Sequence, residues 1–329
     1  MLQLKNNTPF FADFTLFPNE KAIDALYILV KATFNIGHQW TLANEQLPAT
    51  KADVYYSDSE SSSIKYVSDY HCGKTASDVI MLGHACAPNG QVVSQLDVRL
   101  RVGKTSKVIR VFGERQWHDG LITSAKPFKS MPMVYENAYG GSYKANENIF
   151  SQTDNPVGLG FVGQRSKEQM NGLPLPHLED PKHLITGLND QPQPACFAAS
   201  ASHWLPRSRY AGTYDEQWEI NRSPYLPFDF DKRFFNAAHP DLIYPGFLKG
   251  GELVEITNMH PQADLKFAIP HVSLSAEVHI AGDIFKPVLN LETLLLEPND
   301  LSLSMVWHAS LACDKKTMQI NQIKINRLG

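Results

Sequence analysis

The sequence predicts a mainly β fold built from two packed, antiparallel β-rich lobes in a sandwich-like arrangement. Apolar residues alternate with polar ones along several segments, which is the pattern of strands with one buried face. Glycine and proline recur between residues 139 and 206, where long regular elements cannot persist. With 329 residues, of which 43% are hydrophobic and 19% charged, the chain can form a sizeable core.

These patterns divide the chain into three parts. We expect an N-terminal β-rich lobe over residues 1–145, an irregular connection over residues 146–206 and a C-terminal β-rich lobe over residues 207–329. A long irregular stretch is uncommon inside a compact domain unless it serves a function. The connection is therefore either a contact surface or a crossover between the lobes.

The clearest strand signals lie in the first half. Residues 25–36 form one nearly continuous apolar run. Between residues 96 and 102, leucine and valine occupy every second position and charged residues occupy the positions between. Gly103-Lys104 separates this run from a second one at 107–112, so we expect a β-hairpin with one solvent-facing side. Residues 57–63, rich in serine and acids, are expected to form a mobile hairpin tip.

In the second half the pattern turns helical near residues 213–223. Thr213 can cap such a helix, Asp215 and Glu216 favour its first turn, and Trp218 begins an apolar stripe that Pro224 ends. Alternation typical of strands returns beyond residue 250, over 253–256, 272–280, 289–296 and 301–307.

Charge and hydropathy favour a soluble protein. The formal net charge is −4, from 30 basic and 34 acidic residues, so the chain has no surplus positive field for a nucleic acid. Residues 1–11 do not resemble a secretory signal, and the longest apolar stretch, 25–30, is too short to span a bilayer. We expect a cytoplasmic protein that binds neither nucleic acid nor membrane.

No nucleotide or metal site is expected from local motifs. Gly73-Lys74-Thr75 and Gly103-Lys104-Thr105 resemble the end of a phosphate-binding loop, but both lack the glycine five positions earlier. A possible zinc set lacks diagnostic spacing, and at most three of its members could converge. We expect free, mostly buried thiols and neither metal nor cofactor; the zinc set comprises His71, Cys72, His84 and Cys86.

The sequence also lacks the two local signatures of hydrolases that we sought, Gly-x-Ser-x-Gly and His-Glu-x-x-His. We therefore assign no catalytic residue and expect a protein that is not an enzyme. Because active sites need no local motif, a hydrolase using Asp229, Asp231 or His239 remains an alternative.

Aromatic residues and arginines concentrate between residues 204 and 247. Tyrosine, tryptophan and arginine are enriched where proteins bind other proteins. The alternative is that these side chains form a core between the lobes. The residues that we expect to contact a partner are Arg209, Tyr210, Tyr214, Trp218, Arg233, Phe234 and Phe235.

Many short motifs follow one another in order from about residue 25 to 307. They include Gly73-Lys74-Thr75-Ala76-Ser77-Asp78-Val79, Leu82-Gly83-His84-Ala85, Tyr135-Glu136-Asn137-Ala138-Tyr139-Gly140-Gly141, Asn155-Pro156-Val157-Gly158-Leu159-Gly160-Phe161, Ala211-Gly212-Thr213-Tyr214-Asp215 and Arg233-Phe234-Phe235-Asn236-Ala237-Ala238. Together these motifs resemble a bacterial family known as domain of unknown function 2169, the type VI secretion effector adaptors. The sequence departs from the family pattern at Thr75, where proline is expected, and at His177, where asparagine is commoner.

The resemblance implies an adaptor or chaperone without catalytic residues. Its partner would be a secreted effector, a spike-tip protein or both, and it would help to load the effector onto the secretion spike. A hydrolase and a structural component of the spike itself are the alternatives. The oligomeric state is left open.

Overall fold

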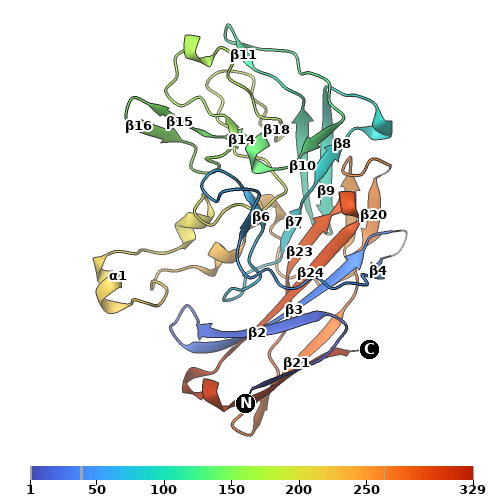
Figure 1. The fold of residues 1–329 in the computed structure, drawn as a ribbon, viewed down its shortest axis with the longest axis vertical. Coiled ribbons are helices and arrows are strands. Elements are labelled where there is room, and N and C mark those ends of the chain that lie inside the picture. The colour runs from blue at the N-terminus through green and yellow to red at the C-terminus, as the bar shows by residue number, and fades with distance from the viewer. Residues whose placement is uncertain (1, 38–39, 263, 329) are drawn as a thin grey trace.

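A computed structural model describes residues 2–37, 40–262 and 264–328 and confirms a mainly β protein with antiparallel sheets (Figure 1). The lower part of the molecule in Figure 1 carries a six-stranded and a four-stranded sheet. The upper part carries a five-stranded sheet and most of the short strands. Among the described residues, no helix has the length and apolar character needed to cross a membrane.

The six-stranded sheet pairs strands from the first hundred residues with strands that follow residue 289. β3 is buried along nearly its whole length, as expected for a continuous apolar run inside a sheet. It pairs antiparallel with β24, from Ala25 opposite Ala312 to Asn35 opposite Ser302. The strand order is β2 (Phe11–Pro18), β3 (Asp24–Asn35), β24 (Ser302–Ala312), β23 (Asn290–Glu297) and β7 (Asp78–Met81), with β4 (Thr41–Leu42) beside β3.

The five-stranded sheet contains the expected hairpin. Leu96, Val98, Leu100 and Val102 are buried, and the charged residues between them face solvent. Gly103 adopts φ +53°, which a tight turn with a left-handed first residue requires. The order is β18 (Leu178–Glu179), β10 (Thr105–Phe112), β9 (Gln95–Val102), β19 (Leu253–Thr257) and β20 (Leu265–Ala268).

The four-stranded sheet brings both termini together at the lower end of Figure 1. Its first strand pairs parallel with the last strand of the chain, with Leu4 opposite Ile323. The order is β1 (Gln3–Asn7), β25 (Ile320–Leu328), β21 (Ser273–Ile280) and β22 (Asp283–Phe285).

The remaining strands are short and form two-stranded pairs. They are β5 (Val54–Tyr55), β6 (Ile64–Tyr66), β8 (His84–Cys86), β11 (Trp117–His118), β12 (Leu121–Ile122), β13 (Ser130–Pro132), β14 (Tyr139–Gly140), β15 (Ser142–Ala145), β16 (Asn148–Ser151) and β17 (Leu159–Gly160). Residues 57–63 do form the tip between β5 and β6. The region from 146 to 206 is largely irregular, as expected.

The one α-helix among the described residues is α1 (Glu216–Asn221), inside the expected range. Its cap differs from the expectation. Asp215, not Thr213, occupies the N-cap position and accepts the backbone N–H of Trp218. The 3₁₀-helices are η1 (Pro88–Gly90), η2 (Tyr135–Asn137), η3 (Glu168–Met170), η4 (Arg207–Tyr210), η5 (Lys232–Phe235), η6 (Pro240–Leu242), η7 (Pro298–Asp300) and η8 (Asp314–Gln319).

Strand pairing crosses both expected boundaries. Each larger sheet combines strands that precede residue 146 with strands that follow residue 206, and a single hydrophobic cluster contains Leu26, Val98 and Ile325 from the three sheets. The two halves of the chain thus share their sheets and their core. The division into 1–145, 146–206 and 207–329 stays a prediction.

This shared core predicts a large cost for truncating its side chains. Leu294 on β23 is fully buried in the main cluster, whereas Leu121 is 74% exposed. Leu294→Ala should lower the free energy of unfolding by about 2–5 kcal/mol because it leaves a cavity. Leu121→Ala, the same chemical change at the surface, should cost less than about 0.5 kcal/mol. Urea unfolding measures both, and equal effects would contradict the core assignment.

Candidate partner-binding surface

Residues 211–230 project from the body as an arm that carries α1 near its tip (Figure 1). The arm is closed at its base, where the backbone N–H and Oγ1 of Thr213 donate to the Asp229 carboxylate at 2.9 and 2.8 Å. Gly212 adopts φ +81°, and a Cβ there would lie 2.8 Å from both Asp229 and Pro227. Glycine is therefore required for this closure.

Side-chain contacts inside the arm give it a small core of its own. The indole N–H of Trp218 donates to the carbonyl of Tyr225 at 2.8 Å. Tyr214 packs edge-on against Trp218, with ring centroids 4.7 Å apart. Together with the Asp215 cap, these contacts order the arm although it lies outside the main core.

The arm is also tied to the body through Glu20, between β2 and β3. Arg222 donates to the carbonyl of Glu20 at 2.8 Å and to that of Leu226 at 2.7 Å. Its guanidinium lies 4.4 Å from the centroid of the Phe228 ring, and Lys232 forms an ion pair with the Glu20 carboxylate at 3.2 Å. The base and one side of the arm are thus fixed.

This ordered arm leaves several large apolar side chains uncovered. Tyr214 is 54% exposed, Ile220 69%, Tyr225 40% and Phe228 80%. A rigid loop with clustered exposed apolar groups is unusual on a monomeric surface unless it contacts another molecule. We call residues 211–230 the arm surface.

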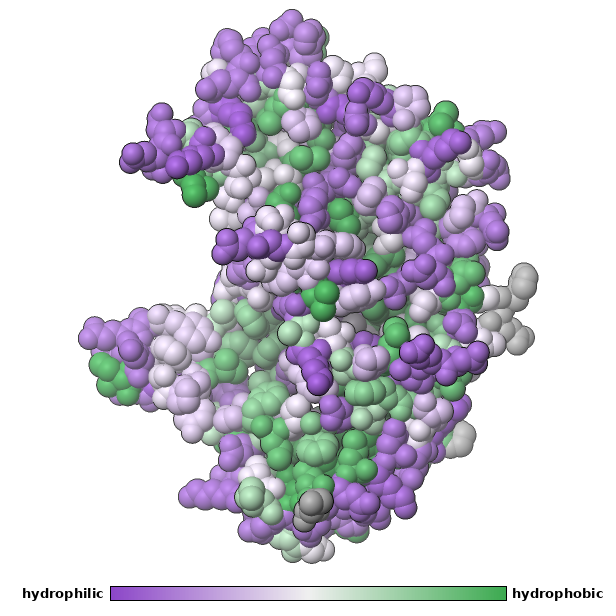
Figure 2. All heavy atoms as spheres, in the orientation of Figure 1, coloured by the Kyte–Doolittle hydropathy of each residue, from purple (hydrophilic) through white to green (hydrophobic). Residues whose placement is uncertain are grey.

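A second projection lies on the same side of the molecule. It is the β15–β16 hairpin, whose Ile149 is 75% exposed (Figure 1). Figure 2 shows the surface hollowed between this hairpin and the arm. A cavity of about 530 Å³ is lined by Thr153 and Asp154, which follow the hairpin, and by Pro206 and Arg209, which precede the arm.

The polar groups of this cavity pair with one another. Lys107 is buried and contacts Asp180 at 3.2 Å and Asp241 at 2.9 Å. His239 accepts the backbone N–H of Asp241 at 3.1 Å and caps η6. Burial and the nearby Lys107 lower the pKa of His239 to about 4, so its ring is neutral at pH 7.

The three candidate hydrolytic residues do not meet in this cavity. His239 lines it, but Asp229 is bound to Thr213, and Asp231 is paired with Arg233, whose Nε lies at 2.8 Å. Hydrogen bonds from Thr213 and Arg233 lower the pKa values of the two carboxyls, which keeps both ionised. These three residues therefore do not form one site, and the carboxylate that lies beside His239 is that of Asp241, whose Oδ2 is 3.6 Å from the ring Nδ1.

The predicted contact residues fall into two groups. Tyr214 and Trp218 lie on the arm, and Arg209 is exposed at the rim of the cavity. The others lie at the base of the arm: Tyr210, Phe234 and Phe235 are partly covered, whereas Arg233 is exposed and lies over the Tyr210 ring. That these residues contact a partner stays a prediction. The sequence analysis missed Ile149 and Ile220, because no local sequence pattern indicates that they are exposed.

The candidate zinc set is not assembled either. His84 is exposed on β8, Cys86 is half-buried beside Asn299, and Cys72 is buried beside Tyr27. All four cysteines of the chain are free thiols, three of them buried. His71 instead lies beside two residues from the far end of the chain.

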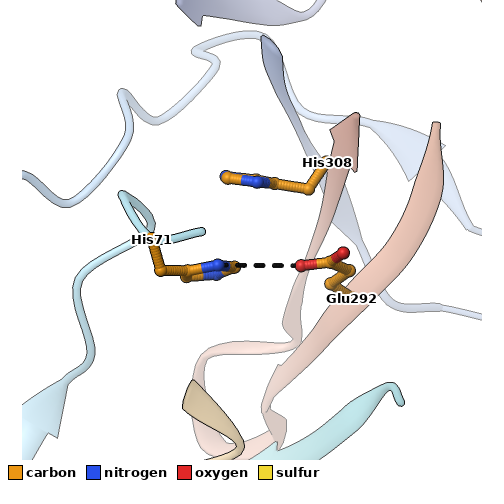
Figure 3. Close-up of side chains that lie close together, drawn as sticks. All are labelled: His71, Glu292 and His308. Carbon is orange, nitrogen blue, oxygen red and sulfur yellow. Dashed lines mark ion pairs between the residues drawn. The ribbon is translucent and has the colours of Figure 1, made fainter. Parts of the chain in front are cut away.

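Figure 3 shows this buried cluster, in which the rings of His71 and His308 stack with centroids 4.3 Å apart and Glu292 lies beside them. His308 Nε2 contacts the carbonyl of Asp69 at 2.8 Å, and His71 Nδ1 accepts the N–H of Gly73 at 3.1 Å. Face-to-face rings do not direct their in-plane lone pairs to one point, as tetrahedral zinc requires. The arrangement fits stacking and hydrogen bonding instead.

A buried carboxylate next to this cluster connects several segments. Asp78, fully buried, accepts from Lys74 Nζ at 2.7 Å, from Asn236 Nδ2 at 3.0 Å and from the N–H of Ala237 at 2.8 Å. Lys74, part of the rejected phosphate-loop match, is thus already bound. Thr75, which departs from the family pattern, donates its hydroxyl to Asn236 at 2.8 Å.

Comparison with known proteins supports a family assignment. Residues 21–308 match the model of a family described as an uncharacterized protein conserved in bacteria, DUF2169. The chain belongs to this family. Neither a search of curated proteins nor one of solved structures found a match. The DUF2169 match contains the arm, the cavity, Asp78 and the stacked histidines, so all of these features belong to the part of the chain that defines the family.

The closure of the arm predicts a local effect of Asp229. Asp229→Ala removes the two hydrogen bonds from Thr213 that close the base of the arm, so the arm should open locally more often. Amide hydrogen exchange in residues 213–229 should become roughly tenfold faster, with little change in the melting temperature. Asp190→Ala is the matched control because Asp190 closes a separate turn through Thr186. Equal exchange in the arm of both variants would contradict the bracing.

Glu292 predicts a pH dependence of stability. Burial raises its pKa to about 7, so between about pH 4.5 and 7 the folded state holds a proton that the unfolded state releases. This group therefore stabilises most at low pH, and the benefit is lost as pH rises towards 7. His308, whose pKa burial lowers to about 4, acts in the opposite sense, with stability lost as pH falls from about 6.5 to 4.

Glu292→Gln isolates the pH dependence of stability that comes from Glu292, because His308 is present in both the variant and the parent. The free energy of unfolding of the variant minus that of the parent should be about 2 kcal/mol higher at pH 8 than at pH 5, because only the parent loses stability as pH rises. Urea unfolding at the two pH values measures the difference. Glu147→Gln at an exposed site serves as the control, and a difference of the opposite sign would contradict the assignment.

Proposed function

We propose that this protein is an adaptor that holds another protein on its arm surface, with the β15–β16 hairpin opposite. The observation that carries the proposal is the arm itself, which is closed, capped and tied to the body, yet leaves Ile220 and Phe228 mostly uncovered. Ordering an exposed apolar loop costs conformational entropy, and a partner that buries it would offset that cost.

The composition of the surface favours a protein partner over a small molecule. Aromatic side chains next to Arg222 and Arg209 are typical of residues that dominate protein interfaces. The cavity between the two projections is open, and its buried Lys107 is already paired with Asp180 and Asp241. A bound protein could cover both projections and the hollow between them.

The proposed partner is a type VI secretion effector, or the spike-tip protein that carries it. This assignment rests on the resemblance of the sequence motifs to effector adaptors, and membership of DUF2169 is compatible with it. In this role the adaptor works in the cytoplasm, keeps the effector competent for loading and stays behind when the spike is fired.

Purification of the tagged protein from a bacterial host that expresses the secretion genes tests this function. Mass spectrometry should identify an effector or a tip protein in a stable complex. Ile220→Ser combined with Phe228→Ser should reduce its recovery by at least about tenfold, because both side chains would lose apolar contact with the partner. The tagged protein itself should remain in the cells.

The matched control is Leu121→Ser combined with Val92→Ser, which changes two exposed apolar residues outside the arm, 74% and 57% exposed. These substitutions should leave recovery unchanged. Failure to recover any effector or tip protein would overturn the proposed partner. Equal loss in both double variants would overturn the arm as its binding surface, and export with the spike would point to a structural component.

A further inference from the structure

One edge of the five-stranded sheet is incomplete. β18 pairs with β10 only through Arg110 and Val111. Beyond Glu179 the chain leaves the sheet in a turn, in which the Asp180 carboxylate accepts the N–H of Lys182 at 2.9 Å. In the part of the chain that the structure describes, no strand flanks the preceding stretch of β10, from Thr105 to Ile109.

Backbone groups on this stretch point to the open side. The N–H of Phe112 donates to the carbonyl of His177 at 2.8 Å. The backbone N–H and C=O groups of even-numbered residues on β10 therefore point towards β18. Backbone groups alternate between the two sides of a strand, and Ser106 and Val108 must therefore face the vacant position. Within the described ranges, neither residue takes part in a backbone hydrogen bond outside its pairing with β9.

The vacant position is open space. A cavity of about 590 Å³ borders residues 105–108 and the Asp180-Pro181-Lys182 turn. The uncovered stretch of five residues corresponds to about 17 Å of extended chain. An additional strand placed here would continue the line of β18.

Charges around the vacancy select the chemistry of such a strand. Lys107 pairs with both Asp180 and Asp241, so these three residues together carry one surplus negative charge. Asp97 is neutralised by Arg110, whose Nε lies 2.7 Å from it. Three further cations line the cavity without a carboxylate within 4.0 Å among the described residues: Arg99, Lys104 and Lys182. The edge is therefore basic, which disfavours pairing with the same edge of a second copy.

We propose that the open edge of β10 between Thr105 and Ile109 is a second binding site, which takes an extended acidic segment of a partner protein as an added strand. Its free backbone groups match a peptide backbone, and its unpaired cations match acidic side chains. The inference rests on the proposed function only in taking a protein as the partner, since this edge is separate from the arm surface.

Fluorescence anisotropy with a labelled ten-residue peptide of alternating glutamate and threonine tests the site on the full chain. Two matched peptides separate the contribution of charge from that of backbone hydrogen bonds. One has lysine in place of glutamate, and the other is N-methylated at alternate amides. We expect the acidic peptide to bind at least about tenfold more tightly than either, because the lysine peptide is repelled by the basic edge and the N-methylated peptide lacks backbone donors. Binding should also weaken with added salt.

Two variants locate the peptide. Lys104→Glu combined with Lys182→Glu should weaken binding about tenfold, and so should Ser106→Pro, which removes one edge donor from the backbone. The matched control, Lys51→Glu combined with Lys144→Glu, makes the same charge change at exposed sites outside the cavity. Amide exchange at Ser106 and Val108 should slow when the acidic peptide is bound.

Equal binding of the N-methylated peptide, or unchanged exchange at Ser106 and Val108, would overturn strand addition. Absence of binding by the acidic peptide would overturn the site. The double substitution at Ile220 and Phe228 should leave peptide affinity unchanged. Failure of this inference is therefore distinguishable from failure of the arm as a partner-binding surface.

Discussion

The buried carboxylate of Asp78 is the interaction on which the arrangement of the candidate surfaces depends. A buried charge is stable only when hydrogen-bond donors surround it. Lys74 supplies a charged donor from the preceding loop. The side-chain amide of Asn236 and the backbone N–H of Ala237 supply two neutral donors from the chain that follows the arm. Because Asp78 also begins β7, one carboxylate connects the edge of the six-stranded sheet to the base of the arm.

This connection limits how the arm can move. Its return segment is anchored at Asn236 by Asp78, and its inner side is held by Glu20 through Arg222 and Lys232. With the Thr213–Asp229 closure, the arm is fixed from three directions. A surface ordered before binding loses less entropy when a partner arrives, so its few exposed apolar side chains can contribute more of their contact energy to affinity.

Several strands could be located from the sequence, but the pairs that these strands form could not. Alternation located the hairpin around Gly103, and the continuous apolar run located β3, because burial on one face or on both leaves a local pattern. The pairing of β3 with β24 leaves none, since it joins segments from opposite ends of the chain. The sequence analysis did not predict that both halves share their sheets, because pairing between distant segments leaves no local pattern.

The candidate site was predictable in composition and not in exposure. Tyrosine, tryptophan and arginine density directed attention to residues 204–247, which do contain the arm. Phe228 and Phe235 belong to the same aromatic-rich stretch, yet one is 80% exposed and the other packs against His71. Which of them faces solvent depends on Glu20 and Asp78, residues far away in the sequence.

The two proposed surfaces differ in chemistry in a way that suits temporary binding. The arm surface is apolar and fixed to the body, so affinity for a partner bound there would hardly depend on salt. The edge of β10 offers backbone hydrogen bonds and cations, which orient a partner and speed its approach but weaken as salt rises. Two modest surfaces engaged together hold a partner more tightly than either one alone. A partner can also leave the two surfaces one after the other. Once it has left one surface, it is no longer held close to the second, so binding there weakens as well.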